Sequence, residues 1–253
     1  MRIASFFPAL LFTVALIGVA LANVPASWVA TRVAQSTGQK VLLANSTGTL
    51  WQGSAELALM SGPEALGRLP GRLRWRLVPH WRGLAFVLDS TEQGLLASPI
   101  SGTLGWSGGH LEPGQLVLPA QILMGLGAPF NTLRLEGVLT THWDGLDWNY
   151  QNITPRSLVS ITVQAEQMRS RLSPVAPLGQ YRLRMAWGPL GGKLDLETVV
   201  GPLMLSGQGS LVNGRLGFDG QATTSDALEP QLIGLLSILG KREGAVTRLH
   251  YQG

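Results

Sequence analysis

The chain has 253 residues and no cysteine, which excludes disulfides, thiolate metal sites and cysteine nucleophiles. Charged residues make up only 13%, well below the ~25% of an average soluble domain, and part of this apolar excess lies in one N-terminal segment. The net charge of +4 comes mainly from 16 scattered arginines, a distribution that suits solubility and weak attraction to anionic surfaces rather than nucleic-acid binding.

The N-terminus contains a long uncharged segment that runs from Ile3 to Val24. About 20 apolar residues are enough to span a bilayer, so we predict a transmembrane anchor over residues 1–24. The alternative is a signal peptide cleaved after Ala22, because Ala20-Leu21-Ala22 has the small residues of a cleavage site. The flank before the segment is only Met1-Arg2, which predicts a cytoplasmic N-terminus and a periplasmic remainder.

The residues that follow the predicted anchor have helical periodicity. Trp28, Val29 and Val33 fall on one face of a helix, which predicts a membrane-proximal amphipathic helix over residues 25–37. Trp28 occupies the position at which an aromatic residue commonly lies in the membrane interface.

From residue 38 onward, apolar and polar residues alternate with period two, which indicates half-buried strands. The first clear strand motif is Gly48-Thr49-Leu50-Trp51-Gln52-Gly53, in which we expect Trp51 to be a core anchor. The run Leu73-Arg74-Trp75-Arg76-Leu77 places apolar side chains inward and arginines outward. Residues 63–70 are expected to form a loop. Asp144-Gly145 and Asn213-Gly214 are typical hairpin turns.

The C-terminal region combines one helix with a last strand. Asp226 to Glu229 has the spacing of a capping box, and the apolar stripe consists of Leu228, Leu232, Leu235, Leu236 and Leu239. The predicted fold is therefore mainly β. An N-terminal transmembrane helix precedes one periplasmic domain, residues 38–253, built as a single large antiparallel β-sheet that resembles an open barrel and carries a short C-terminal helix.

The sequence contains few candidates for chemistry. His80, His110, His142 and His250 are scattered without a metal-ligand spacing. Asp144 and Asp147 beside Trp143 and Trp148 could bind a sugar, but a plain hairpin turn is the favoured interpretation. Residues 68–82 contain five arginines with Trp75 and Trp81. This combination would suit a site for single-stranded nucleic acid or a basic strand face exposed to solvent. The arginines alternate with apolar residues, which favours the strand face. We predict no enzyme, no catalytic, cofactor-binding or metal-binding residues, and no nucleic-acid partner.

The order of four motifs resembles the type II secretion system protein N family along nearly the full length. They are the N-terminal apolar segment, the motif from Gly48 to Gly53, the run from Leu73 to Leu77, and the ending from Leu235 to Gly244 with a terminal strand. The resemblance implies a single-pass inner-membrane component of the general secretion pathway, without catalytic residues. It implies a supporting role in the envelope-spanning machine that exports folded proteins across the outer membrane. The implied partners are other secretion components (inner-membrane platform, pseudopilus or outer-membrane secretin) and inner-membrane lipid.

Two other functions stay open from the sequence. The apolar face of a curved sheet could hold acyl chains, as in AsmA-like lipid-handling proteins of the periplasm. An enzyme acting on envelope polysaccharide is the third hypothesis, and the lack of paired acid and base residues argues against it.

Overall fold

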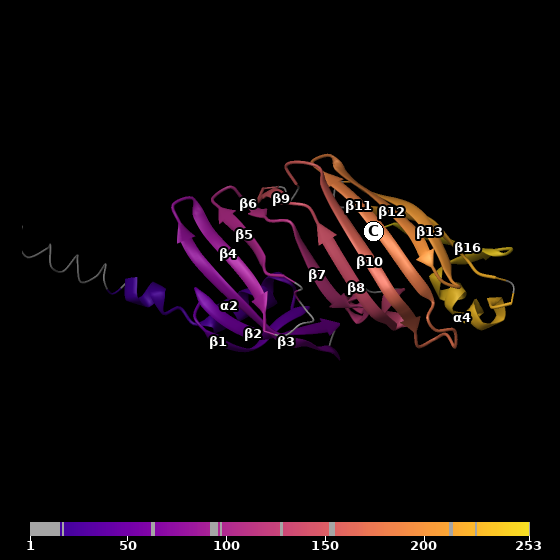
Figure 1. Ribbon diagram of the computed structural model, residues 1–253, viewed down its shortest axis with the longest axis horizontal. Coiled ribbons are helices and arrows are strands. Elements are labelled where there is room, and N and C mark those ends of the chain that lie inside the picture. Colours follow the sequence, from indigo (N-terminus) through magenta and orange to yellow (C-terminus); the bar gives the residue numbers. More distant parts are fainter. Residues whose placement is uncertain are drawn as a thin grey trace, which may run out of the picture.

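The computed structural model describes residue 16 and residues 18–61, 64–91, 96, 98–126, 129–151, 155–212, 215–225 and 227–252. Among these residues the chain forms sixteen strands and a few short helices. All strand pairs are antiparallel, and they build an elongated molecule (Figure 1). The mainly β class and the antiparallel pairing predicted from the sequence are confirmed.

The strands form two sheets, so the predicted single sheet is wrong. The first sheet has seven strands in the order β1 (Val41–Gly48), β2 (Gln52–Ser61), β3 (Glu64–His80), β4 (Gly83–Ser90), β5 (Ile100–Gly105), β6 (Gly108–Leu111) and β9 (Leu146–Asn149). The second has nine, in the order β15 (Lys241–Glu243), β16 (Val246–Gln252), β14 (Arg215–Thr223), β13 (Met204–Val212), β12 (Gly191–Val200), β11 (Gly179–Gly188), β10 (Val159–Ser170), β8 (Leu135–Trp143) and β7 (Gly114–Pro119).

One long pair of strands joins the two sheets. Strand β7 continues the line of β6 along the chain, and β9 continues the line of β8. These two lines run antiparallel to each other, so that β6 pairs with β9 and β7 pairs with β8. The register is the same on both sides of the break, because Leu111 pairs with Leu146 and Gly114 pairs with Trp143. The ladder is interrupted at Pro113, which has no backbone N–H to donate. The division into two sheets therefore arises within one strand pair.

The same junction corrects the predicted hairpin at Asp144-Gly145. These two residues lead from β8 in the second sheet to β9 in the first, and β8 does not pair with β9. The N–H of Asp144 donates to the carbonyl oxygen of Ser160 at 3.1 Å, which keeps the junction tied to the second sheet. The other predicted turn, Asn213-Gly214, lies outside the described residues.

The predicted loop over residues 63–70 is also wrong, because Glu64 already begins β3. Strand β4 pairs with β3 only from Leu73 onward. The preceding part of β3 therefore has a sheet neighbour on one side only, where a proline such as Pro70 is tolerated within a strand.

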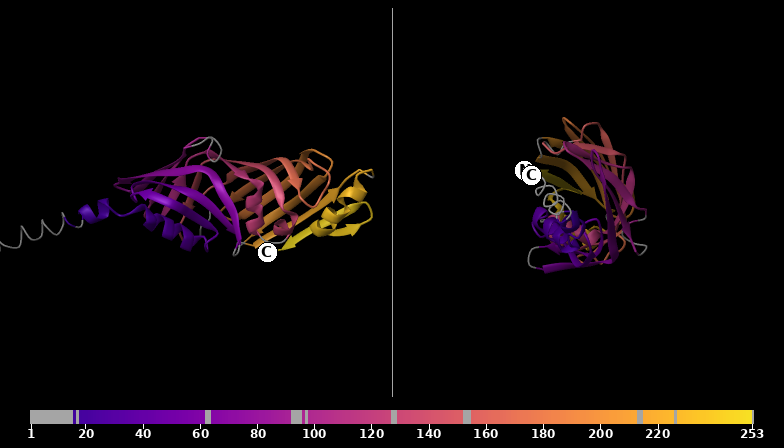
Figure 2. Two further views of the ribbon diagram at one scale, coloured as in Figure 1. Left: turned by 90° about the horizontal axis from the view of Figure 1, so that it is seen from below. Right: turned by 90° about the vertical axis from the view of Figure 1, so that its left-hand side faces the viewer.

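The two sheets together curve into a trough that does not close into a barrel (Figure 2). Helix α2 (Ala26–Ser36), the 3₁₀ helix η1 (Ala120–Leu126), α3 (Phe130–Leu133) and α4 (Glu229–Leu239) lie on its inner side (Figure 2). Helix α2 packs through Ala26, Val29 and Val33 against the first sheet. Its predicted apolar stripe therefore covers the sheet, while Trp28 stays 47% exposed.

A second group of contacts ties the sheets together from inside. Leu116 of β7 and Ile122 of η1 lie in the same cluster as Val41, Leu73 and Leu88 of the first sheet. The apolar core is thus continuous beneath the junction, although the backbone ladder is not.

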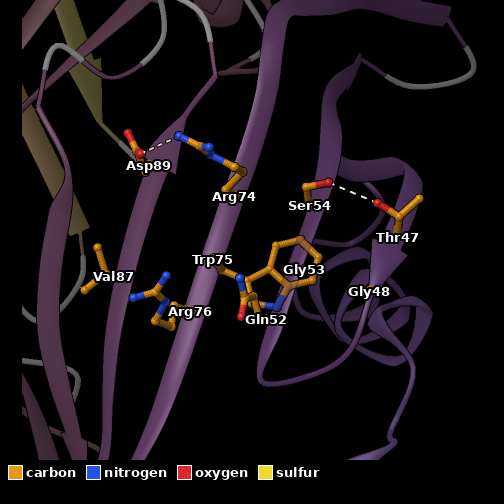
Figure 3. A pocket seen from close by; sticks show the side chains of 10 residues that line it. All are labelled: Thr47, Gly48, Gln52, Gly53, Ser54, Arg74, Trp75, Arg76, Val87 and Asp89. Atoms are coloured by element: carbon orange, nitrogen blue, oxygen red, sulfur yellow. Dashed lines mark hydrogen bonds and ion pairs between the residues drawn. The ribbon is translucent and has the colours of Figure 1, made fainter.

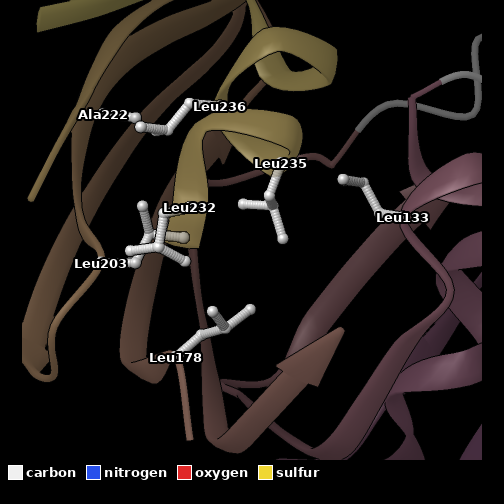
Figure 4. Close-up of a cluster of buried hydrophobic side chains, with 7 residues drawn as sticks. All are labelled: Leu133, Leu178, Leu203, Ala222, Leu232, Leu235 and Leu236. Carbon is white, nitrogen blue, oxygen red and sulfur yellow. The ribbon is translucent and has the colours of Figure 1, made fainter. Parts of the chain in front are cut away.

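Helix α4 closes the far end of the trough. Its buried residues Leu232, Leu235 and Leu236 pack against Leu133, Leu178, Leu203 and Ala222 (Figure 4). The predicted apolar stripe of this helix is confirmed. The N-cap residue of the helix is Leu228, which makes no side-chain cap hydrogen bond, and Asp226 of the predicted capping box lies outside the described residues. The last strand, β16, forms as predicted.

Aromatic residues lie opposite glycines at six places in the two sheets. The paired residues are Trp75 and Gly53, Phe86 and Gly102, Trp148 and Gly109, Trp143 and Gly114, Trp187 and Gly192, and Phe218 and Gly209. At each glycine, a Cβ atom would lie 2.3–3.4 Å from the nearest atom of the facing ring. Each aromatic ring therefore covers its neighbouring strand, and at the four glycines where this distance is below 3.0 Å only glycine leaves room for the ring. These pairs explain why glycines recur beside aromatic residues in the strand motifs.

The N-terminal anchor falls largely outside the description, since residues 1–15 and 17 are not part of it. Within the residues that are described, no helix is long and apolar enough to cross a membrane.

Candidate functional surfaces

The four histidines lie on different parts of the sheets. His142 is exposed on β8, and the ring Nδ1 of His80 accepts a hydrogen bond from the N–H of Arg82 at 3.3 Å. His250 forms a 2.6 Å contact with Asp219 on the neighbouring strand β14. In the described part of the chain, no group of three or more histidine, aspartate or glutamate residues is placed to hold a metal ion.

Among the described residues, His110 is the histidine with two carboxylate neighbours. Its Nδ1 atom lies 2.9 Å from Asp147, its partner across the strand pair, and its Nε2 atom lies 3.4 Å from Glu112. The hydrogen bond to Asp147 and the charges of both carboxylates raise the pKa of His110 above the usual 6.5, against a smaller lowering by burial. The sequence could not reveal this cluster, because His110 and Asp147 are 37 residues apart.

The His110 cluster predicts a pH-dependent contribution to stability. The folded pKa is raised, so the contribution is fully present below pH 6.5 and is lost as the pH rises through the folded pKa. His110→Gln should therefore destabilise the protein more at about pH 5.5 than at about pH 8.5, by no more than about 1 kcal/mol because the ring is partly exposed. Urea unfolding at both pH values measures the difference, with His142→Gln as the control. An equal effect of His110→Gln at both pH values would contradict the assignment.

The predicted sugar-binding cluster does not converge. Trp143 donates its indole N–H to the carbonyl oxygen of Glu112 at 2.9 Å, and its ring lies over Gly114. The ring of Trp148 covers Gly109, while Asp147 contacts His110. These side chains hold the junction between the sheets together, which accounts for their presence without a ligand.

The arginine-rich strand β3 has a groove of about 560 Å³ on its outer side (Figure 3). Here Arg74 pairs with Asp89 at 2.7 Å, and Thr47 and Ser54 are hydrogen-bonded at 3.0 Å. Trp75 also lines this groove, but its side chain is only 5% exposed and packs in the inner cluster with Ala55, so little of its ring is open for a base to stack on, as a nucleic-acid site would require. The groove has the character of a solvated strand face.

Trp51 is not the core anchor that the sequence suggested. It is partly exposed and outside the buried clusters, and its indole N–H donates to the carbonyl oxygen of Leu21 at 2.8 Å. The buried tryptophan of this region is Trp75, at 5% exposure. The indole N–H of Trp75 donates to the carbonyl oxygen of Leu50 at 3.0 Å. Leu50 precedes Trp51 in the turn between β1 and β2.

A second recess, of about 550 Å³, lies between the β3–β4 and β5–β6 turns. Arg82, Trp106, His110 and Arg156 line it. Trp106 is 87% exposed, and Trp81 in the neighbouring turn is 78% exposed. The recess therefore combines arginine side chains with large exposed aromatic surfaces, which suits contact with another surface better than catalysis.

The two sheets also present strand edges. Strands β1 and β9 end the first sheet, and β7 and β15 end the second. Strand β15 pairs only with residues 246–248 of β16, whereas residues 247–252 of β16 pair with β14 on the other side. An edge with free backbone groups can accept a strand from another protein.

Comparison with known proteins identifies the family. The family model described as type II secretion system (T2SS), protein N matches residues 39–249, a range that includes both sheets. No curated protein and no solved structure matches the chain significantly. Because the family model covers far more than half of the chain, the resemblance seen in the sequence is confirmed, and the chain belongs to the type II secretion system protein N family.

Proposed function

We propose that the protein supports the assembly or operation of the type II secretion machine through protein–protein contacts and without catalysis. Family membership over residues 39–249 is the observation that carries this proposal. The side chains that suggested chemistry are engaged in structural contacts, as at His110 and Trp143. The exposed strand edges offer a physical means of binding another component by strand addition.

We further propose that the protein is a single-pass protein of the inner membrane. The uncharged segment from Ile3 to Val24 would be the anchor. The N-terminus would then be cytoplasmic and the two sheets periplasmic, where other secretion components can reach them. An inserted anchor requires that the protein stay in the membrane fraction during alkaline carbonate extraction. Release by carbonate, or a mature N-terminus at Asn23, would contradict the anchor.

Deletion of the gene tests the secretion proposal. We expect the exported enzymes to disappear from the culture medium and to accumulate in the periplasm, with recovery when the wild-type gene is supplied. A small periplasmic marker protein serves as the control, because it should stay inside if the outer membrane is intact. Unchanged secretion in the deletion strain would contradict the proposal.

The lipid-handling alternative requires an apolar face that acyl chains can reach. Helices α2, η1 and α4 pack against the inner apolar side of the sheets, and these contacts favour the secretion role. Mass spectrometry of the purified protein distinguishes the two, since stoichiometric bound phospholipid would support the alternative.

A further inference from the structure

Three exposed tryptophans lie in the part of the chain that builds the first sheet, which is also the part from which the N-terminal segment leaves. We name this surface the tryptophan end and define it by Trp28, Trp81 and Trp106 together with Arg32, Arg82 and Arg156. These three tryptophans are 47%, 78% and 87% exposed. They belong to the start of α2 and to the turns after β3 and β5, all in the part of the chain that precedes the second sheet.

Direct contacts place the N-terminal segment at this end. The N–H of Leu50 donates to the carbonyl oxygen of Val24 at 2.7 Å, and the indole N–H of Trp51 donates to that of Leu21 at 2.8 Å. Pro25 also forms a β-bridge with Thr49. Helical residues 18–22 and the β3–β4 hairpin lie at the same left-hand end of the molecule (Figure 1).

The charge of this surface is mainly positive, because the carboxylate of Asp147, which lines the same recess as Arg82 and Arg156, contacts His110. The segments that build it are residues 18–36, 48–53, 79–84, 104–110 and 155–158, and they contain three arginines and no aspartate or glutamate. Two of the arginines lie over tryptophan rings: Arg32 over Trp28 at 5.0 Å and Arg82 over Trp81 at 4.5 Å. The third, Arg156, lies near Ser107, with its Nη2 atom 3.5 Å from the hydroxyl oxygen.

Several arginines elsewhere on the sheets pair with carboxylates, whereas Arg76, Arg134, Arg169 and Arg215 have no ion pair among the described residues. Arg74 pairs with Asp89, Arg171 with Glu136, and Arg184 with Glu197, at distances of 2.6–2.7 Å. Among the described residues, no ion pair includes Arg32, Arg82 or Arg156. The positive charge of the tryptophan end is therefore directed to solvent.

We propose that the tryptophan end rests on the anionic surface of the membrane that holds the N-terminal segment. Tryptophan side chains concentrate in the headgroup region because one part of the ring is apolar and the N–H is polar. Arginines beside them attract anionic lipid headgroups. An uncharged segment that leaves the domain at the same end brings this surface to the bilayer. The inference rests on the proposed membrane attachment and adds an orientation to it.

Single-cysteine labelling of the full chain tests this orientation cleanly, because the protein has no cysteine of its own. Ser107→Cys places a fluorophore in the β5–β6 turn, next to Trp106. Leu172→Cys is the matched control in the exposed β10–β11 turn, where Leu172 is 43% exposed. Each labelled protein is reconstituted into vesicles of phosphatidylethanolamine and phosphatidylglycerol that carry a nitroxide quencher on the headgroup.

We expect quenching of the label at position 107 and little quenching at position 172. Arg82→Gln should lower the ratio of docked to undocked molecules about fivefold, since each arginine near an anionic surface adds about that factor. Vesicles of phosphatidylcholine alone should reduce the quenching in the same way. Trp106→Ala, at an exposed position, should also weaken quenching while leaving the unfolding midpoint unchanged.

Equal quenching at positions 107 and 172, or no quenching at either, would overturn the proposal. An unquenched label at position 107 that becomes shielded in a separate sample with purified secretion components added would also overturn it, and would make this surface a protein interface. The vesicles contain no other secretion component, so these results are independent of the deletion phenotype that tests the secretion role.

Discussion

Replacement of Trp75 by alanine is expected to lower the free energy of unfolding by about 3–5 kcal/mol. The indole is 5% exposed and packs in the cluster that includes Ala26 of α2 and Ala55 of β2. It also covers Gly53, whose Cβ position would lie 2.4 Å from the ring. Loss of the ring would therefore leave a cavity between the first sheet and α2, and would leave the carbonyl oxygen of Leu50 without its indole donor.

Urea unfolding followed by circular dichroism measures this effect. Trp106→Ala is the matched control, because it removes the same side chain from a position that is 87% exposed. Its effect on the free energy of unfolding should stay within about 0.5 kcal/mol. Equal losses for the two variants would show that Trp75 is not a core residue in solution.

Leu232→Ala is expected to destabilise the protein by about 2–5 kcal/mol. Leu232 is fully buried on α4 and contributes to the cluster that joins this helix to Leu133 of α3, to Ala222 of β14, and to Leu178 and Leu203 just before β11 and β13. Truncation to alanine removes apolar contacts without lowering helix propensity, so the loss would measure packing alone. The midpoint of thermal unfolding should fall accordingly.

The next residue of the same helix provides the control. Ile233 is 51% exposed, and its replacement by alanine should change the free energy of unfolding by no more than about 0.5 kcal/mol. If Leu232→Ala behaved like Ile233→Ala, α4 would not be docked against the second sheet. The secretion assay with the Leu232→Ala variant would then show whether a docked α4 is needed for function.

Local sequence patterns were sufficient to predict which faces of many elements are buried. Leu73, Trp75 and Leu77 pack inward as the alternation indicated, and the leucine stripe of α4 packs as its helical spacing indicated. The burial of a side chain in a strand or helix depends on periods of two and 3.6 residues, which are visible within a few residues of the chain.

Pairing between distant strands was not predictable in this way. The break between the sheets depends on Pro113 lying opposite the segment that contains Asp144 and Gly145. Similarly, Trp51 lies between Gly48 and Gly53 in the sequence, but the tryptophan that covers Gly53 is Trp75 from the neighbouring strand. The His110 cluster required a strand pair between segments 37 residues apart.

The sequence by itself determined the antiparallel β class, the inward faces of the strands, the C-terminal helix and the family resemblance. Only the tertiary structure decided that the strands divide into two sheets, and that Trp106 of the β5–β6 turn shares a recess with Arg82 of the β3–β4 turn and with Arg156. The physical reason is that side-chain alternation is a local property of a strand. Register and the meeting of turns depend instead on backbone hydrogen bonds and on the fit of aromatic rings over glycines, which join residues far apart in the chain.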